Sequence, residues 1–168
     1  MKKILFILLL FISCNPPAEK NEEVLRGKVV SVADGDTVTI LTENDEQIRI
    51  RLYGIDAPEK GQDFSNKSRQ FLNDLCYGKI VSIEKKGIDQ YERVLGIVYI
   101  GELNLNKEMV RNGLAWYYDH YVKDADMEAL EHAARKQKLN IWSMKNPTPP
   151  YEFRRNQRMG KIKLKGTY

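Results

Sequence analysis

Cysteine and histidine are scarce in this chain of 168 residues, which has two of each. No histidine lies near Cys76 in the sequence to activate a thiol nucleophile, and the apolar residues around it recur at the spacing of a helix. The sequence therefore predicts that Cys76 is a small core residue. His120 and His132 have no partners at the spacing of a metal site, so both are expected at the surface.

Long apolar runs are also lacking, with one exception at the N-terminus. Residues 4–12 are apolar throughout and follow two lysines. The run is too short to span a bilayer as a helix, but it has the length of a signal-peptide core. It leads into Phe11-Ile12-Ser13-Cys14, which resembles a bacterial lipobox, where a small residue precedes the cysteine that is lipidated.

We therefore expect a signal peptide over residues 1–13, a lipid on Cys14 and a polar tether over residues 14–23. The protein would then be exported and held by this N-terminal lipid anchor at a membrane, on the periplasmic face or the cell surface. The alternative is an ordinary signal peptide in which Cys14 is incidental. If Cys14 carries lipid, Cys76 has no thiol left to pair with and no internal disulfide can form.

Acidic residues are absent from the last fifteen positions, which carry six basic residues. The formal net charge of the whole chain is +4, yet residues 14–153 contain more acidic than basic side chains. Residues 143–168 are therefore expected to form a basic C-terminal tail. Such a tail could concentrate polyanions near the protein through counterion release, or it could be a solvated, disordered end.

Residues 24–142 are expected to form one domain. Alternating or β-branched stretches predict strands at residues 24–32, 38–40, 48–52, 80–83 and 94–100. Apolar spacing predicts a helix at residues 64–76, and two further helices are expected after the N-cap candidates Asn104 and Asp124. Five short strands with a helix between the third and fourth predict an α+β fold that is mainly β-barrel, a five-stranded Greek-key OB-fold with about three helices.

Three acidic residues stand out by their positions next to strands. Asp36 ends an Asp34-Gly35-Asp36 turn directly before one strand, and Asp56 follows the next strand, with Glu59 one turn further on. If these strands pair antiparallel through the turn at residues 43–46, Asp36 and Asp56 converge. Converging carboxylates without histidine or cysteine partners suit a hard cation, Ca²⁺ or Mg²⁺, with several positions left for water. Taken singly, each motif is also typical of a solvated turn or a helix start.

Two arginines accompany these acids. Arg51 lies on the polar face of the strand that leads to Asp56, and Arg93 lies in the turn between the last two strands. Guanidinium groups can bind the equatorial oxygens of a phosphoryl transition state bidentately, and a free carboxylate can orient or deprotonate the attacking water. The combined set is what hydrolysis of a phosphodiester requires.

Four motifs and the end of the domain resemble, in order, those of staphylococcal nuclease-like proteins, the thermonucleases. They are Asp34-Gly35-Asp36-Thr37-Val38, Arg51-Leu52-x-Gly54-Ile55-Asp56-x-Pro58-Glu59, Tyr91-x-Arg93, Gly113-Leu114-Ala115 and Leu139-Asn140-Ile141-Trp142. The resemblance covers nearly all of residues 24–142. It implies an OB-fold with appended helices, one bound Ca²⁺, and hydrolysis of DNA and RNA to leave 3′-phosphate ends.

Carried over residue by residue, the resemblance implies roles for individual positions. It assigns the metal to Asp36, Asp56 and the backbone carbonyl of Ala57, and the chemistry to Arg51, Glu59 and Arg93. Tyr91 and Tyr121 are the substrate contacts expected by family position, although the aromatic residues near Tyr121 could pack helices instead of stacking on bases. A monomer that prefers single-stranded DNA or RNA is expected.

One position departs from the family pattern. Glu92 stands where the family usually has glycine. A glycine there would serve a turn with positive φ, which glutamate tolerates poorly. The carboxylate of Glu92 also adds negative charge near the expected position of the substrate phosphate.

A rival hypothesis from a different class is a non-catalytic OB-fold lipoprotein that binds nucleic acid. A decayed copy would be expected to lose at least one of the five catalytic positions, and this chain retains all of them: Asp36, Arg51, Asp56, Glu59 and Arg93. A structural calcium-binding lipoprotein would leave the two arginines unexplained. The sequence therefore favours a calcium-dependent nuclease.

Overall fold

The computed structural model describes residues 24–118 and 123–165, and the side chains of all of these except 161–165. The expected signal peptide, the tether with Cys14, His120 and Tyr121 lie outside the described residues. In chain order the elements are strands β1 (Val24–Asp34), β2 (Thr37–Leu41), β3 (Gln47–Leu52) and β4 (Ile55–Asp56), helix α1 (Ser65–Cys76), strands β5 (Ile80–Ile88), β6 (Val94–Ile100) and β7 (Leu103–Asn104), helix α2 (Leu105–Arg111), strand β8 (Trp116–Tyr117), helix α3 (Ala125–Lys136), the 3-10 helix η1 (Asn140–Ser143) and helix α4 (Pro150–Lys165).

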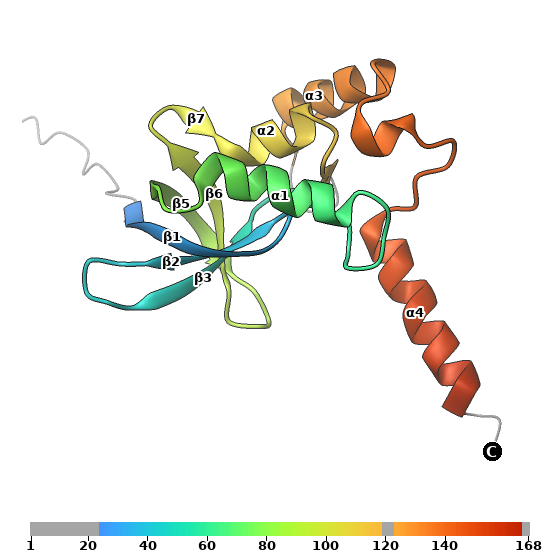
Figure 1. Cartoon of the computed structure of the whole chain (residues 1–168), viewed down its shortest axis with the longest axis horizontal. Helices are drawn as coiled ribbons and strands as arrows, with labels where there is room; N and C mark the ends of the chain where they lie inside the picture. The colour runs from blue at the N-terminus through green and yellow to red at the C-terminus, as the bar shows by residue number, and fades with distance from the viewer. Residues whose placement is uncertain (1–23, 119–122, 166–168) are drawn as a thin grey trace, which may run out of the picture.

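Five of the strands close into a barrel. The sheet runs in the order β3-β2-β1-β5-β6, with β7 beside β6, and β3 also pairs with β6. The closing β3–β6 pair is parallel, from Ile50 opposite Val94 to Leu52 opposite Gly96, whereas the other pairs are antiparallel. The prediction of an α+β fold dominated by a five-stranded barrel is confirmed, and Figure 1 shows α1, α2 and α3 along one side of it.

The barrel interior is filled by alternate residues of its strands. In β3, Ile50 and Leu52 are fully buried, and alternation places Arg49 and Arg51 on the other side of the strand. Helix α1 covers the barrel with Leu72 and Cys76, which are both inaccessible to solvent, so Cys76 is the core residue that the sequence predicts. Burial raises the pKa of the Cys76 thiol to about 12, which keeps the thiol neutral and unreactive.

Helices α2 and α3 begin at the predicted cap residues. The side chain of Asn104 accepts a hydrogen bond from the backbone N–H of Lys107, and that of Asp124 accepts two from the first turn of α3. Helix α3 ends at Lys136, because Lys138 and Asn140 adopt positive φ angles of 53° and 46° and turn the chain into η1. There Trp142 packs edge-to-face on Trp116, with ring centroids 5.3 Å apart.

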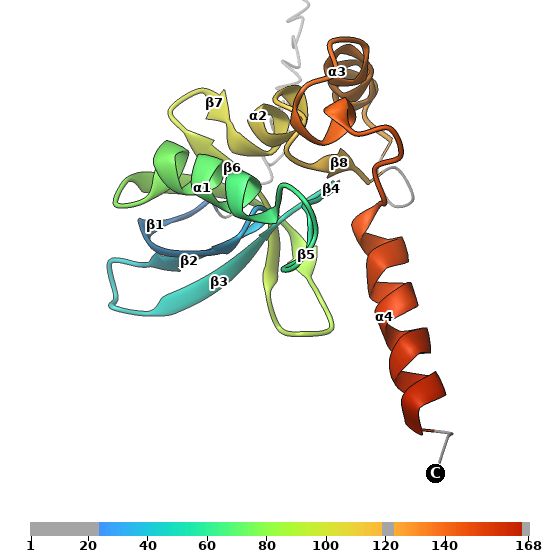
Figure 2. The same ribbon diagram turned by 45° about the vertical axis from the view of Figure 1, so that its right-hand side comes forward.

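The basic C-terminal segment forms a helix over the described residues from Pro150 to Lys165. The described part of the chain therefore has four α-helices, where the sequence predicted about three. Figures 1 and 2 both show α4 running away from the barrel, and residues 155–160 are exposed. Among the residues that the structure describes, no helix combines the length and apolar character needed to cross a membrane.

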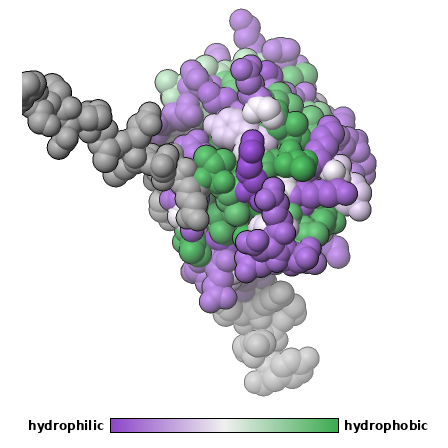
Figure 3. Space-filling model, turned by 90° about the vertical axis from the view of Figure 1, so that its left-hand side faces the viewer, coloured by the Kyte–Doolittle hydropathy of each residue, from purple (hydrophilic) through white to green (hydrophobic). Residues whose placement is uncertain are grey.

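The surface that faces the viewer in Figure 3 mixes apolar and hydrophilic side chains. Large apolar residues that remain exposed in the described part of the molecule include Val24, Tyr77 and Ile80. Folded proteins commonly leave such residues at the surface, because there is too little polar surface to cover the whole molecule. These residues need no functional explanation.

Gly35 is the point at which the turn between β1 and β2 touches α1. A Cβ atom at this position would lie 1.8 Å from Ser68 Oγ and 2.8 Å from the Cβ atoms of Ser68 and Ala57. Ser68 is itself fixed, because its hydroxyl donates a hydrogen bond of 2.7 Å to the carbonyl of Leu114. Glycine therefore allows the turn that carries Asp36 to sit directly on the core.

We expect Gly35→Ala to lower the free energy of unfolding by about 1–3 kcal/mol or more, because overpacking forces the core to shift. Urea unfolding followed by far-ultraviolet circular dichroism measures this change. Gly160→Ala is the control, since a Cβ there meets no atom within 4 Å. Because Gly160 lies inside α4, alanine should leave stability unchanged or raise it by up to about 1 kcal/mol. Equal stability of the Gly35→Ala protein and the wild type would contradict the packing argument.

Candidate active site

The two predicted metal-ligating carboxylates meet at one end of the barrel. The antiparallel β2–β3 pair sets Thr37 opposite Arg51, and the backbone N–H of Leu52 donates to the carbonyl of Asp36 at 2.8 Å. Asp56 lies in β4, which pairs with β8. Arg51 Nη2 lies 3.2 Å from Asp36 Oδ2 and 3.0 Å from Asp56 Oδ1, so one nitrogen contacts both acids.

Asp36 is buried, with 6% of its surface exposed. Its Oδ1 accepts a hydrogen bond from Thr37 Oγ1 at 3.1 Å, and its Oδ2 accepts one from the backbone N–H of Ala57 at 2.6 Å. Burial raises the pKa of the Asp36 carboxyl; Asp34 and Asp56 raise it further, while Arg51 and the N–H of Ala57 oppose them. A cation bound here would stabilise the ionised carboxylate.

Arg51 is held in a fixed orientation at the base of the site. Its Nη1 donates to the carbonyls of Leu52 at 3.1 Å and Ile55 at 2.9 Å. Its side chain is 16% exposed. The guanidinium is therefore preorganised by backbone acceptors as well as by the two aspartates.

Arg93 is positioned by a residue that the sequence analysis missed. Asp89 Oδ2 accepts from Arg93 Nε at 2.8 Å and pairs with Nη2 at 2.7 Å. Burial raises the pKa of the Asp89 carboxyl, but hydrogen bonds from Arg93 and from the backbone of Tyr91 outweigh burial and lower it overall. Arg93 Nη1 reaches within 3.4 Å of Thr37 Oγ1, which brings the turn at residues 89–93 beside Asp36. The Asp-x-x-x-Arg spacing of Asp89 and Arg93 was the signal available in the sequence.

Some aromatic residues in the second half of the chain pack the helices, and others lie at the candidate site. Trp116 is buried against Trp142, and the hydroxyl of Tyr117 accepts a hydrogen bond from the backbone of Asp124, so these two hold helices. Tyr118 instead lines a hollow of about 480 Å³ together with both site arginines. Tyr91 is 64% exposed, and its ring lies 5.6 Å from the guanidinium of Arg93.

Glu59 shares with Asp56 a partner that the sequence did not predict. Arg154, from α4, donates through Nη1 to Glu59 Oε1 at 2.5 Å and to Asp56 Oδ1 at 3.2 Å. Its Nη2 donates to Asp56 Oδ2 at 3.1 Å. Arg154 and Asp56 are 98 positions apart, and the sequence marked Arg154 only as part of a basic tail, with no spacing to suggest this contact.

These residues fit a hard cation bound through oxygen. The carboxylates of Asp36 and Asp56 converge, and the guanidinium of Arg154 is a positive group lying between Asp56 and Glu59. Within residues 24–118 and 123–165 no group of three or more histidine, cysteine, aspartate or glutamate side chains is arranged to enclose a metal. Two convergent carboxylates are the kind of donor set found in open cation sites, and the part played by the Ala57 carbonyl stays a prediction.

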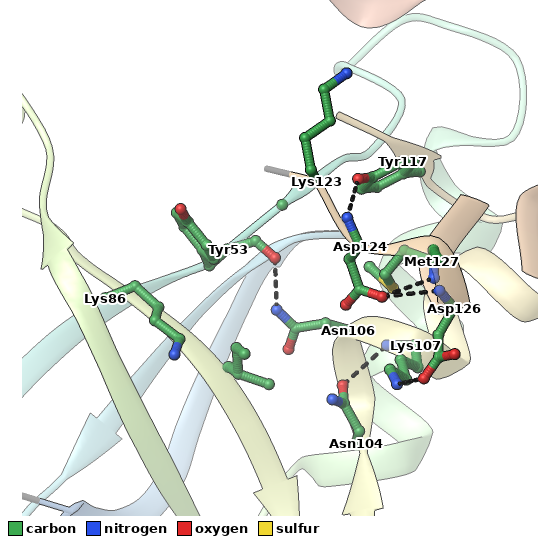
Figure 4. A pocket seen from close by; sticks show the side chains of 13 residues that line it. Tyr53, Lys86, Asn104, Asn106, Lys107, Tyr117, Lys123, Asp124, Asp126 and Met127 are labelled. Atoms are coloured by element: carbon green, nitrogen blue, oxygen red, sulfur yellow. Dashed lines mark hydrogen bonds and ion pairs between the residues drawn. The ribbon is translucent and has the colours of Figure 1, made fainter. Parts of the chain in front are cut away.

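A larger hollow of about 580 Å³ lies on the other side of Tyr53 and Gly54. Figure 4 shows that several of its polar groups pair with one another. Lys107 pairs with Asp126 at 2.8 Å, and Asn106 donates to the carbonyl of Tyr53 at 2.9 Å. The hollow contains neither the site arginines nor the converging aspartates, so the smaller hollow beside Arg51 and Arg93 is the better candidate for substrate.

The fold and the site together define a class: an OB-fold barrel with an acidic, oxygen-donor centre flanked by arginines. Residues 49–144 match the family described as "Staphylococcal nuclease homologue". The chain belongs to this family.

Several relatives cover most of the chain. An "Uncharacterized endonuclease" of Haemophilus influenzae is 38% identical over 158 residues, which span 94% of this chain and 88% of the relative. A "Micrococcal nuclease" of Shigella flexneri is 43% identical over 77% of this chain and 80% of its own length. An "Uncharacterized endonuclease" of Escherichia coli is 41% identical over 77% of this chain and 85% of its own length. The likeness therefore extends over nearly whole proteins.

Glu92 adopts the conformation that the sequence analysis expected of a glycine. Its φ angle is 60°, in the left-handed region, within the turn closed by the backbone hydrogen bond from Glu92 N–H to the carbonyl of Asp89. An L-residue in this region places its Cβ too close to a backbone carbonyl. The turn that carries Arg93 is therefore strained at this position.

We expect Glu92→Gly to raise the free energy of unfolding by about 1 kcal/mol, because glycine has no Cβ to strain the turn. Glu92→Ala is the control: it removes the carboxylate but keeps the Cβ, and should leave stability nearly unchanged. Thermal and urea unfolding of the three proteins would measure both effects. A Glu92→Gly protein less stable than the Glu92→Ala protein would show that backbone strain at this position does not control the stability of the turn.

Proposed function

We propose that this protein is a calcium-dependent phosphodiesterase that hydrolyses DNA and RNA and leaves 3′-phosphate ends. The observation that carries the proposal is the shared contact of Arg51 with Asp36 and Asp56, with Arg93 next to the same turn. It sets cation ligands and phosphate-binding groups side by side. Membership of the nuclease family and the names of the relatives support the same activity.

The carboxylates of Asp36 and Asp56 and the backbone carbonyl of Ala57 would hold Ca²⁺, with water completing the coordination. When bound, the ion would supply positive charge that polarises the phosphate and stabilises the charge gained in the transition state. Asp36 is suited to this role because its carboxylate is buried beside other acids.

The two arginines would bind the phosphate directly. Asp89 occupies Nε and Nη2 of Arg93, which leaves Nη1 on the side of Thr37 and the metal site. Arg51 is held in place by the carbonyls of Leu52 and Ile55, and it lines the same hollow as Arg93, where it could meet a phosphate oxygen. Both groups would stabilise the equatorial oxygens of the pentacoordinate transition state.

Glu59 would orient or deprotonate the attacking water. The water oxygen forms a bond to phosphorus while the bond from phosphorus to the 5′-oxygen breaks. The phosphate then remains on the 3′-oxygen, and the 5′-oxygen takes up a proton and leaves as a hydroxyl. In this scheme Glu59 acts on the water and is not an essential ligand of the metal.

Aromatic side chains would bind the bases. Tyr118 lines the hollow beside both arginines, Tyr91 stacks near Arg93, and Tyr121 is assigned to the same role by family position. Stacking on aromatic rings is tolerant of sequence and requires unpaired bases, so a preference for single-stranded DNA and RNA follows. We propose a monomer as the active form.

Glu59→Gln should separate catalysis from metal binding. The variant keeps the size of the side chain but loses its charge, so cleavage of single-stranded DNA should fall on the order of 10²–10⁴-fold while Ca²⁺ binding largely survives. Asp36→Asn and Asp56→Asn are the comparison variants, and both should lose Ca²⁺ affinity and cleavage together. Calorimetry with Ca²⁺ and a cleavage assay on all four proteins measure this.

Full cleavage by the Glu59→Gln protein would reject the role of Glu59. A wild type that binds Ca²⁺ and single-stranded DNA without cutting it would favour the rival, a non-catalytic OB-fold lipoprotein. Addition of a chelator to the active wild type should abolish cleavage, and activity that persists would rule out the metal.

We also propose that the protein is exported and anchored by a lipid on Cys14, since two acyl chains on one residue are sufficient for stable membrane attachment. Cys14→Ser should leave the protein unprocessed or move it to the soluble fraction after cell fractionation. Cys76→Ser is the control and should not alter the distribution. An unchanged membrane fraction in the Cys14→Ser strain would contradict the anchor.

A further inference from the structure

A third guanidinium lies in the candidate site, and the proposed reaction does not use it. Arg154 Nη1 and Nη2 contact the two oxygens of Asp56 at 3.2 and 3.1 Å, and Nη1 also contacts Glu59 at 2.5 Å. Asp56 is 3% exposed, whereas the side chain of Arg154 is 39% exposed. A group from the surface thus reaches a buried acid.

Arg154 engages the atoms that the reaction needs. Asp56 Oδ1 already accepts from Arg51, and both Asp56 oxygens are occupied once Arg154 is in place. The guanidinium occupies one side of Glu59 Oε1, so a water molecule cannot donate a hydrogen bond to the oxygen from that side. With Arg154 docked, the metal ligand and the carboxylate that serves the water are therefore both engaged.

The helix that carries Arg154 is attached to the rest of the molecule near its first turn. Gln62 donates to the carbonyl of Thr148 just before α4, and Phe153 lines a small hollow with Gly61 and Trp116. Residues 155–160 are exposed, and Figures 1 and 2 show the helix running away from the barrel. Removing Arg154 from the site would therefore disturb little packing.

We infer that Arg154 is an internal counter-cation that closes the site in the absence of Ca²⁺ and is displaced when the ion binds. The inference rests on the metal site of the proposed function. Arg154 occupies both Asp56 oxygens, whereas Arg51 contacts only Oδ1 of Asp56, so Ca²⁺ would have to compete with Arg154 for this carboxylate. The divalent ion interacts more strongly with two carboxylates than a single guanidinium does. The side chain of Arg154 is already partly exposed to solvent, so water can solvate its charge once it has moved away from Asp56. Glu59 can then accept a hydrogen bond from the attacking water.

The affinity for Ca²⁺ tests the competition directly. Arg154→Gln should bind Ca²⁺ roughly tenfold more tightly than the wild type, since the ion no longer has to displace charge-assisted hydrogen bonds. Arg155→Gln is the matched control, because it removes the same charge from an exposed neighbour on the same helix. Arg154→Lys, which keeps the charge but loses the planar fork, should lie between the two.

Calorimetry on the full chain in mild detergent supplies these affinities, and circular dichroism verifies that each variant is folded. An Arg154→Gln protein that binds Ca²⁺ no more tightly than the Arg155→Gln protein would overturn the inference while leaving the metal site intact. An Arg154→Gln protein that binds more weakly would show that Arg154 supports the site instead of closing it. If none of the proteins binds Ca²⁺, the proposed metal site fails and the inference fails with it.

A second readout follows Arg154 itself. Restricted rotation of a bidentate guanidinium gives separate nitrogen-15 signals, which can be assigned by their loss in the Arg154→Gln protein. In a chelator the wild type should show these signals, and saturating Ca²⁺ should convert them to those of a freely rotating arginine. Signals that persist unchanged at saturating Ca²⁺ would place Arg154 on Asp56 alongside the ion and overturn the inference.

Discussion

Asp36 and Asp56 share one guanidinium nitrogen of Arg51, and both acids are almost fully buried. Carboxylates brought this close in a poorly solvated place repel one another, and the pKa of Asp36 is raised as a result of its burial and of its acidic neighbours. The groups around them offset this cost: Thr37 and the backbone of Ala57 donate to Asp36, and Arg154 donates to Asp56. Positive charge beside this acidic centre therefore stabilises its ionised form.

The barrel makes this arrangement rigid, and helix α4 adds a component outside the rigid frame. The β2–β3 register fixes Asp36 beside Arg51, and the parallel β3–β6 pair brings the turn with Arg93 to the same end, so these charges are in place before substrate arrives. The side chains of α4 from 155 to 160 are in water, yet Arg154 reaches a buried acid of the site. Because α4 has few contacts with the barrel beyond its first turn, Arg154 can move away from Asp56 without unfolding the barrel. Under the proposed function, the same acidic centre would be neutralised either by Arg154 or by a bound ion.

Local sequence determined much of this structure. The alternation of β3 and the caps Asn104 and Asp124 follow from local chemistry, and the structure agrees with both. The positive φ at Glu92 was expected from the glycine that the family usually has there, and the structure agrees with this too. The family motifs identified the acids and arginines, and antiparallel pairing through a short turn explains why Asp36 and Asp56 meet.

Tertiary structure decided the contacts between distant segments. The place of Tyr118 beside the arginines and the contact of Arg154 with Asp56 and Glu59 had no pattern in the sequence that could predict them. The pair of Asp89 and Arg93 is local, and its four-residue spacing was visible in the sequence. The contact of Arg154 spans 98 positions and depends on where η1 and the following loop direct α4. Charge composition identifies this segment as basic, but the position of the Arg154 guanidinium depends on how the folded chain places α4 beside Asp56.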